Sequence, residues 1–285
     1  MPRPARTERN AMSMRDGEHE DSVALYWDFE NLHANLCEAA QGEGAYGKPD
    51  NRFKVQEPLV DVQAIVEMAA SFGPIAINRA YCNWQYFGRY RDVLLHSAVE
   101  LIQLFPPGGS AKNGADIRLC LDAVEALGRF GHIATVIVVG GDSDFMPLAQ
   151  KIKALGRTLV GVGARASTNR HWARSCHEFR YYEDVLERAA ESAQAPVAAS
   201  AVGGAATARP ADPAAEIFRR ALQLLAQAHG DPWVETGAVW RMIKRLDSSF
   251  DLREHGYADF RSLLQALAPR VEIHTQESNQ FIRLR

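Results

Sequence analysis

Two carboxylates stand one residue apart, directly after a run of apolar residues. The segment Gly-Gly-Asp-Ser-Asp at residues 140–144 follows residues 133–139, which have the length and β-branched content of a strand buried on both faces. Ligands of open parallel sheets bind beyond the carboxyl ends of the strands. Two carboxylates at such a place repel each other, and a hard divalent cation is the usual way to hold them together. Asp142 and Asp144 are therefore candidate metal ligands.

Three more polar residues occupy comparable places. Asp28 ends an apolar segment at residues 23–28, Asn31 follows at an expected helix start, and Asp116 opens another helix. If the strands ending near Asp28 and Asp142 are neighbours, the four aspartates converge at one edge of the sheet. Such a set would bind one or two Mg²⁺ or Mn²⁺ ions, which activate water and neutralise the charge that develops on a phosphodiester.

Other interpretations of these aspartates stay open at this point. An aspartate before a helix is usually an N-cap, which applies to Asp116 and Asp144. A haloacid-dehalogenase-like phosphatase needs an aspartate where this chain has Glu30, and a toprim-like site needs a glutamate where it has Asp28. A glycosyltransferase would need a nucleotide-sugar pocket that no other segment indicates. Asp122 lies on a different face of its helix from Asp116, which favours a structural role.

The elements that position these residues alternate between strand-like and helix-like segments. The expected strands are residues 23–28, 75–82, 101–105, 133–139 and 158–162. The expected helices are residues 58–71, 89–99, 116–127 and 145–155. In the helix at 116–127, Ile117, Cys120, Leu121 and Val124 form the expected apolar face. The alternation predicts an α/β domain with a parallel sheet and right-handed crossovers.

Composition divides the chain into four segments. Residues 1–20 are polar and predicted to be a disordered tail, and residues 21–187 form the first domain. Residues 188–212 are rich in alanine, glycine and proline, which predicts a linker, and residues 213–285 form a second domain.

The whole chain has the composition of a globular protein. Its 285 residues are 47% hydrophobic and 24% charged, with a net charge of −3, which argues against nucleic-acid binding through bulk charge alone. No membrane span or signal peptide is expected. The four cysteines are widely separated in sequence, which predicts a reduced, cytoplasmic protein.

Basic and aromatic residues indicate where RNA could contact the first domain. Trp84 and Arg89 lie in a segment that mixes arginines with aromatics, a combination that offers phosphate contacts and stacking surfaces. Lys112 and Arg118 flank Asp116, although Arg118 is also spaced to pair with Asp122.

The second domain reads as three amphipathic helices followed by a β-hairpin. This order describes a small winged helix-turn-helix. Residues 212–285 contain ten basic and ten acidic residues, so any RNA binding depends on local clusters. The expected cluster is Arg241, Lys244 and Arg245 on one helix, with a solvated helix face as the alternative.

Three ordered motifs of the first domain resemble those of the NYN domain, a PIN-like nuclease branch that includes the LabA/DUF88 proteins. They are residues 26–32, 112–123 and 139–145. The resemblance implies a three-layer α/β/α fold and a divalent-metal ribonuclease site. Carried onto this chain, that site comprises Asp28, Asn31, Asp116, Asp142 and Asp144. Residues 41–56 are rich in glycine and charged residues and look like a local insertion, to which the sequence assigns no role.

The second domain resembles the OST-HTH or LOTUS domain, especially at residues 249–251, 256–257 and 260–264. That resemblance implies RNA binding in some members and protein contact in others. Together the two domains predict a metal-dependent ribonuclease with a metal-bound water as nucleophile and Asn31 orienting a ligand or the water. The alternative is a non-catalytic RNA-binding or regulatory adaptor. Several properties stay open at this point. They are the identity of the RNA, the choice of RNA over DNA, endo- over exonuclease action, the number of ions, and the oligomeric state, with a homo-oligomer among the alternatives.

Overall fold

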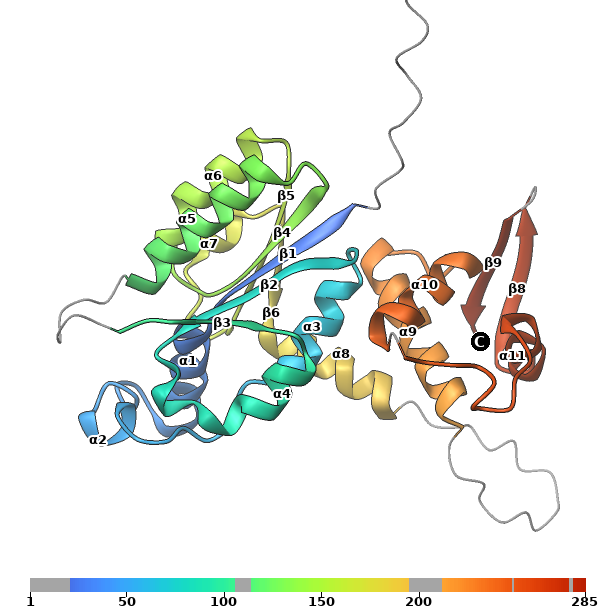
Figure 1. The fold of residues 1–285 in the computed structure, drawn as a ribbon, viewed down its shortest axis with the longest axis horizontal. Helices are drawn as coiled ribbons and strands as arrows, with labels where there is room; N and C mark the ends of the chain where they lie inside the picture. Colours follow the sequence, from blue (N-terminus) through green and yellow to red (C-terminus); the bar gives the residue numbers. More distant parts are fainter. Residues whose placement is uncertain (1–20, 106–113, 195–211, 248, 277–278) are drawn as a thin grey trace, which may run out of the picture.

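The computed structural model describes residues 21–105, 114–194, 212–247, 249–276 and 279–285 (Figure 1). The predicted tail at residues 1–20, Lys112 and residues 195–211 of the predicted linker lie outside these ranges. Two bodies are visible, an α/β domain and a smaller C-terminal domain of helices and short strands (Figure 1).

A six-stranded parallel sheet forms the centre of the first domain, in the order β3-β2-β1-β4-β5-β6. The strands are β1 (Ser22–Asp28), β2 (Ile75–Cys82), β3 (Glu100–Gln103), β4 (Ile133–Val139), β5 (Thr158–Gly163) and β6 (Glu178–Tyr181). The predicted α/β class and parallel sheet are confirmed. Strand β6 has no counterpart among the predicted strands, because four residues with alternating polarity give too short a pattern.

Helices cover both faces of this sheet and make three layers (Figure 1). One face carries α5 (Gly114–Arg129), α6 (Met146–Ala154) and α7 (Arg170–Ser175). The other carries α1 (Phe29–Gln41), α3 (Val62–Ala70), α4 (Arg91–His96) and α8 (Tyr182–Gln194). The short α2 (Pro49–Arg52) lies in the insertion after α1. Because α8 continues to Gln194, the first part of the predicted linker is helical.

The orientation of α5 differs from the sequence-based expectation. Its buried residues are Leu119, Asp122, Ala123, Ala126 and Leu127. Ile117 and Leu121, expected on the core face, are 60% and 63% exposed. The predicted apolar face was therefore wrong at these two positions, whereas Cys120 and Val124 do pack against the core. The helix is rotated by the sheet that it covers rather than by its own apolar residues.

The C-terminal domain has its own core. Its helices are α9 (Pro213–His229), α10 (Thr236–Leu246) and α11 (Phe260–Leu267), and its strands are β7 (Val234–Glu235), β8 (Val271–Gln276) and β9 (Asn279–Leu284). The antiparallel pair β8–β9 is the predicted hairpin wing, and β7 adds a short third strand beside β9. Three helices and a wing confirm the expected architecture of this domain.

The two domains are in direct contact. Ala70, at the end of α3, belongs to the apolar cluster of the C-terminal domain, and Ile75 packs against that cluster. Arg220 of α9 forms an ion pair with the buried Glu67 of α3, and Arg245 Nη1 donates to the carbonyl oxygen of Ala70 at 3.4 Å. The contact lies at the amino ends of the parallel strands, where α3 ends and β2 begins.

Candidate acidic site at the carboxyl edge of the sheet

The central observation is that β1 and β4 are neighbours. Trp27 pairs with Val139 in a parallel register, so the two strands end side by side. A Cβ at Gly140, the first residue after β4, would lie 3.3 Å from the Cβ of Asp28. The condition for convergence of the aspartates is therefore met at the carboxyl edge of the sheet.

The carboxyl groups of Asp28 and Asp116 lie within hydrogen-bonding reach of each other. Burial raises the pKa of the Asp28 carboxyl well above its usual range, and the neighbouring Asp116 raises it further. A hydrogen bond from the backbone N–H of Asn31 lowers the pKa of Asp28. Burial also raises the pKa of Asp116, and the charges of Asp142 and Asp144 add to that increase. The electrostatic contacts thus join all four predicted aspartates into one acidic cluster.

Asp142 and Asp144 occupy a tight turn after β4. Asp142 caps the short 3₁₀ helix Ser143–Phe145, with its Oδ1 accepting from the backbone N–H of Asp144 at 3.3 Å. The capping interpretation therefore applies to Asp142 rather than to Asp144. Asp116 lies inside the first turn of α5 rather than before it, so it is not an N-cap.

Asn31 lies in the first turn of α1, next to Asp28 in the same motif. Its side-chain oxygen accepts a hydrogen bond from Nδ2 of Asn35 at 2.9 Å, one turn later. That bond orients the amide of Asn31 and leaves its own NH₂ group to face other partners.

Sequence reasoning missed a neighbouring acidic side chain and its partners. Glu30 raises the pKa of Asp28 through its charge, so it lies within electrostatic range of the cluster. Arg52 Nε donates to Glu30 Oε1 at 3.1 Å, and its Nη2 forms an ion pair with the same atom at 3.0 Å. Tyr46 OH donates to that oxygen at 3.3 Å. Both partners come from the uninterpreted insertion. Glu30 itself stands in the first motif, but no local signal in the sequence pairs it with Arg52.

The chemistry of the cluster suits a hard cation more than a nucleophilic side chain. Cys120 lies one helical turn after Asp116, and burial together with the charges of Asp116 and Asp144 raises the pKa of its thiol to about 11. A thiolate nucleophile is therefore disfavoured at neutral pH. In the described ranges, no three His, Cys, Asp or Glu side chains are already grouped in a metal-binding geometry.

Both domains match models of known protein families. The model of the NYN domain matches residues 22–204, which is more than half of the chain. The chain belongs to the NYN family. A model of the OST-HTH/LOTUS domain matches residues 214–283, so the second predicted resemblance is also confirmed.

Two proteins that are similar to this NYN protein carry names that assign no activity. It is 33% identical over 105 residues to an uncharacterized protein of Methanocaldococcus jannaschii, a match that covers 37% of this chain and 40% of that relative. The chain therefore spans well under two thirds of the relative's length. A crystal structure of a protein of unknown function from Vibrio parahaemolyticus is similar with a TM-score of 0.46 and 20% identity, over 60% of this chain and 98% of that one.

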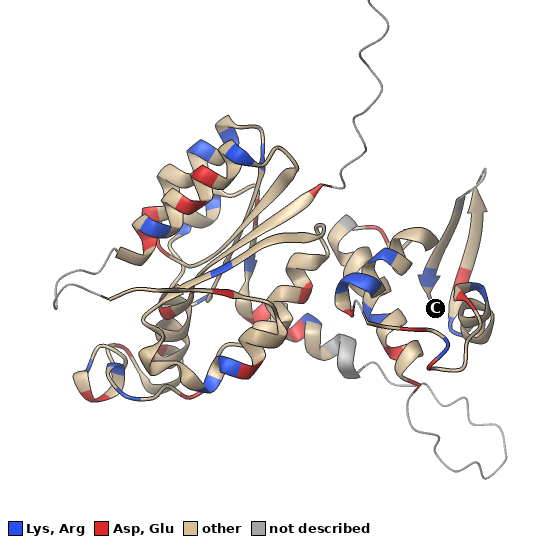
Figure 2. Cartoon of the chain, viewed as in Figure 1, with Lys and Arg blue, Asp and Glu red and all other residues tan. Residues whose placement is uncertain are grey.

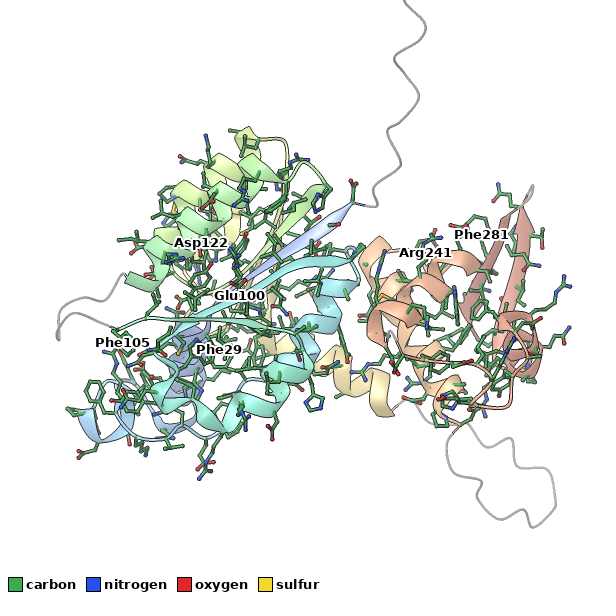
Figure 3. The ribbon with its side chains drawn as sticks, in the orientation of Figure 1. Phe29, Glu100, Phe105, Asp122, Arg241 and Phe281 are labelled. Atoms are coloured by element: carbon green, nitrogen blue, oxygen red, sulfur yellow. The ribbon has the colours of Figure 1, made fainter. Side chains whose placement is uncertain are left out.

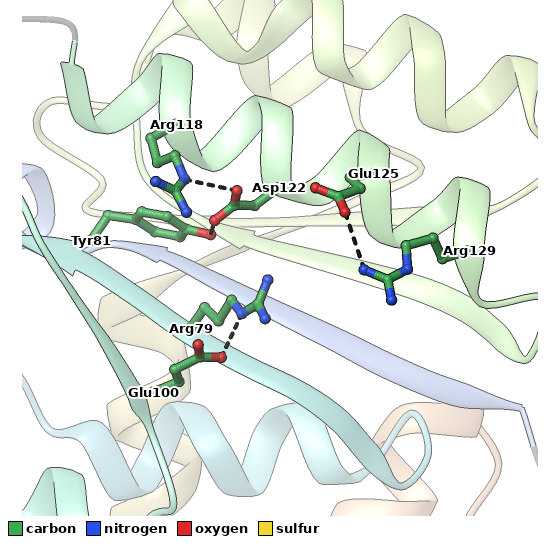
Figure 4. Close-up of polar contacts among 7 residues, drawn as sticks. All are labelled: Arg79, Tyr81, Glu100, Arg118, Asp122, Glu125 and Arg129. Carbon is green, nitrogen blue, oxygen red and sulfur yellow. Dashed lines mark hydrogen bonds and ion pairs between the residues drawn. The ribbon is translucent and has the colours of Figure 1, made fainter.

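Asp122 has a structural role in the NYN domain. It is buried, and its carboxylate accepts from Tyr81 OH at 2.8 Å and from Arg118 Nε at 2.8 Å (Figure 4). The same close-up shows the ion pairs of Arg79 with Glu100 and of Arg129 with Glu125. Asp122 is thus an anchor between α5 and β2, and Arg118 takes the intrahelical partner that its spacing allowed.

The predicted RNA contacts of the NYN domain lie in different surroundings. Trp84 packs against the core, with its ring centroid 5.0 Å from that of Phe29 and its Nε1 donating to the carbonyl of Ile102 at 3.2 Å. Arg89 forms an exposed ion pair with Glu57. Acidic and basic residues both occur along the length of α5 (Figure 2). Lys112 falls outside the described residues.

The predicted basic cluster of the OST-HTH domain is also divided. Arg241 lies on α10 (Figure 3) and faces Glu235 at 3.7 Å. Lys244 Nζ donates to the carbonyl of Phe250 at 2.9 Å. Arg245 reaches the NYN domain at Ala70, so that part of α10 lies at the domain contact.

Close packing at Gly140 gives a test of the site's rigidity. In Gly140→Ala, the new Cβ would lie 2.8 Å from Cε2 of the buried Phe145, so the ring or the strand end must shift. We expect a loss of about 1–3 kcal/mol in the free energy of unfolding, measured by urea denaturation followed by circular dichroism. Gly128→Ala is the control, because a Cβ there meets nothing within 4 Å. Equal stability of the two variants would contradict the expected crowding.

Proposed function

We propose that this protein is a divalent-metal-dependent ribonuclease, with the acidic cluster of its NYN domain as the hydrolytic site and its OST-HTH domain as an RNA-binding module. The observation that carries the proposal is the mutual action of Asp28, Asp116, Asp142 and Asp144 at one edge of the sheet. Asp28 and Asp116 lie within hydrogen-bonding reach of each other, and the charges of Asp142 and Asp144 act on Asp116, an arrangement that is costly unless a cation balances the carboxylates.

The residues of the cluster fit Mg²⁺ or Mn²⁺ by their donor type. All four side chains offer carboxylate oxygens, the ligands that both ions prefer, and Asp28 and Asp116 would be the central pair because they lie within hydrogen-bonding reach of each other. Such an ion would supply a bound water of lowered pKa and offset charge on the phosphate.

Individual side chains have distinct tasks in this proposal. Asp28 and Asp116 hold the cation site together from β1 and α5. Asp142 and Asp144 complete the acidic edge from the turn after β4. The amide of Asn31, oriented by Asn35, positions a water or a phosphate oxygen next to Asp28. Glu30, held by Arg52, adds negative charge at the rim.

The contact between the domains changes how the RNA-binding module would act. A purely flexible tether would raise the local RNA concentration without a fixed direction. Here α9 and α10 pack on the end of α3, at the amino edge of the sheet, whereas the acidic cluster lies at the carboxyl edge. An RNA bound by both domains would therefore run along the NYN domain, whose central strand β1 spans seven residues, about 20 Å.

Cleavage by the full-length protein tests the proposal. End-labelled single-stranded RNA is incubated with the purified protein and Mn²⁺, Mg²⁺ or EDTA, and the products are resolved by size. We expect fragments with either ion and none with EDTA. RNA binding without cleavage over a broad substrate panel would instead favour the adaptor function.

The chemistry of the chain also bears on its location. None of the helices in the described ranges is long and apolar enough to cross a membrane. Cys37, Cys82, Cys120 and Cys176 are all free thiols. We propose a cytoplasmic location, because a reducing compartment preserves free thiols.

A further inference from the structure

An exposed aromatic ring stands on the insertion that follows α1. Phe53, directly after α2, is 57% exposed, although phenylalanine is usually buried. The guanidinium carbon of Arg52 lies 5.8 Å from the centroid of the Phe53 ring, and the Tyr86 ring lies 5.9 Å from it at an angle of 58°. An open ring flanked by a cation and a second ring is the arrangement on which an unpaired base stacks.

The insertion that carries this ring is firmly anchored. Gln56 is buried, its Nε2 donates to the carbonyl of Asn51 at 2.7 Å, and its Oε1 lies 3.1 Å from His33 Nε2. Tyr46 is also buried and contacts the His33 ring edge-on at 5.8 Å. Phe53 is therefore presented by a fixed segment rather than by a loose loop, which lowers the entropic cost of binding.

A short chain of contacts joins this ring to the acidic cluster. Arg52, next to Phe53, donates to Glu30 and forms an ion pair with it, and Glu30 lies in the first turn of α1, directly after the end of β1 at Asp28. Arg52 places a guanidinium group beside the acidic cluster, which reduces the repulsion that a phosphate backbone would meet there. The ring and the cluster thus lie on the same side of the domain, at the carboxyl edge of the sheet.

We propose that Phe53 and Arg52 form a stacking platform for an unpaired RNA base next to the acidic site. This inference rests on the proposed ribonuclease function for its location, and it adds a substrate preference: single-stranded RNA, with one base on Phe53 and its phosphate near Arg52. Trp84, the aromatic expected from sequence to contact RNA, packs on the buried Phe29 (labelled in Figure 3), whereas Phe53 is 57% exposed.

Fluorescence anisotropy of a labelled 12-nucleotide single-stranded RNA, titrated with full-length protein in EDTA, tests the platform without requiring cleavage. We expect Phe53→Ala to weaken binding about tenfold, which corresponds to about 1.4 kcal/mol, within the range for one base stacked on an aromatic ring. Phe53→Trp is expected to restore wild-type affinity, because it keeps a stacking face. Affinity for double-stranded RNA is expected to stay unchanged.

The matched control is Phe130→Ala. Phe130 is also exposed, at 37%, and the guanidinium carbon of Arg129 lies 5.5 Å from its ring centroid, but it precedes β4 at the opposite edge of the sheet. Equal binding by wild type and Phe53→Ala, or an equal loss in Phe130→Ala, would overturn the platform. A tenfold loss specific to Phe53→Ala supports it even if the wild-type protein fails to cleave RNA, and in that case only the ribonuclease proposal falls.

Discussion

Replacing Asp28 with asparagine is expected to abolish metal-dependent RNA cleavage and, in the same variant, to stabilise the metal-free protein. Burial and Asp116 raise the pKa of Asp28, so the folded state binds its proton more tightly than the unfolded state does. Ionisation of Asp28 therefore costs stability as pH rises through its folded pKa, and a neutral amide removes that cost. We expect kcat/KM to fall at least about a hundredfold.

Three measurements check this prediction at pH 7. RNA cleavage with Mn²⁺ gives the loss of activity. Thermal unfolding in EDTA is expected to give a melting temperature about 2–4 °C higher than wild type, the shift that about 1 kcal/mol produces in domains of comparable size. Added Mn²⁺ is expected to stabilise the wild-type protein and not the variant.

The control for Asp28→Asn is Asp122→Asn. Asp122 is also a buried aspartate of the NYN domain, but its carboxylate is paired with Arg118 and Tyr81 rather than facing other carboxylates. Its substitution is expected to lower stability and to keep Mn²⁺-induced stabilisation. If Asp28→Asn retains cleavage, or if both variants respond to Mn²⁺ alike, the assignment of Asp28 to the cation site is wrong.

Removing Arg220 is expected to loosen the contact between the two domains. The Glu67 side chain is only 6% exposed, and burial raises the pKa of its carboxyl while Arg220 lowers it. In Arg220→Met, the carboxylate loses the guanidinium and stays buried. Breaking a fully buried pair typically costs about 3–5 kcal/mol. Because the Arg220 side chain is 35% exposed, we expect about 2 kcal/mol in the free energy of unfolding.

The pH dependence of this loss has a definite sign. At low pH, Glu67 is protonated in the wild type and in Arg220→Met, so the two differ little. As pH rises through the folded pKa of Glu67, the wild type keeps an ion pair and the variant keeps an unpaired buried charge, so the gap widens. Urea denaturation at pH 5 and pH 8 measures it. The double variant with Glu67→Gln is expected to recover much of the loss.

Arg129→Met is the control for the interdomain pair. Arg129 and Glu125 also form an arginine–glutamate pair, at 3.2 Å, but their side chains are 67% and 64% exposed and both belong to α5. We expect a loss of about 0.3–0.5 kcal/mol with little dependence on pH. If Arg220→Met costs no more than this, the contact between α3 and α9 does not hold the domains together.

The acidic residues were recognisable in the sequence because their signal is local. A buried strand is recognisable as a short run of branched apolar residues, and in a parallel sheet all strands end at the same edge. Asp28 and Asp142 could therefore be placed at strand ends without any knowledge of pairing. The same locality explains why the α/β class and the helix–wing order of the second domain were predicted.

The tertiary structure alone decided which residues meet. Only the pairing of β1 with β4 brings Asp28 beside Gly140, where the turn that carries Asp142 begins, and no period along the chain encodes a strand order. The rotation of α5 was decided by the sheet beneath it, which buries Asp122 and leaves Leu121 in solvent. The path of the insertion determined the partner of Glu30, because it places Arg52 next to Glu30 although the two residues are more than twenty positions apart in the sequence.

The docking of the second domain on the first was also decided by the tertiary structure alone. Sequence composition predicted two domains and a linker, but not their contact. Glu67 and Arg220 are far apart in the sequence, and no local pattern around either residue indicates that they pair. Residue types and spacing determine the elements and the chemistry they carry, because backbone preferences and apolar periodicity act over a few residues. Strand order, helix rotation and domain contact depend on burial summed over distant segments, and only the folded chain settles them.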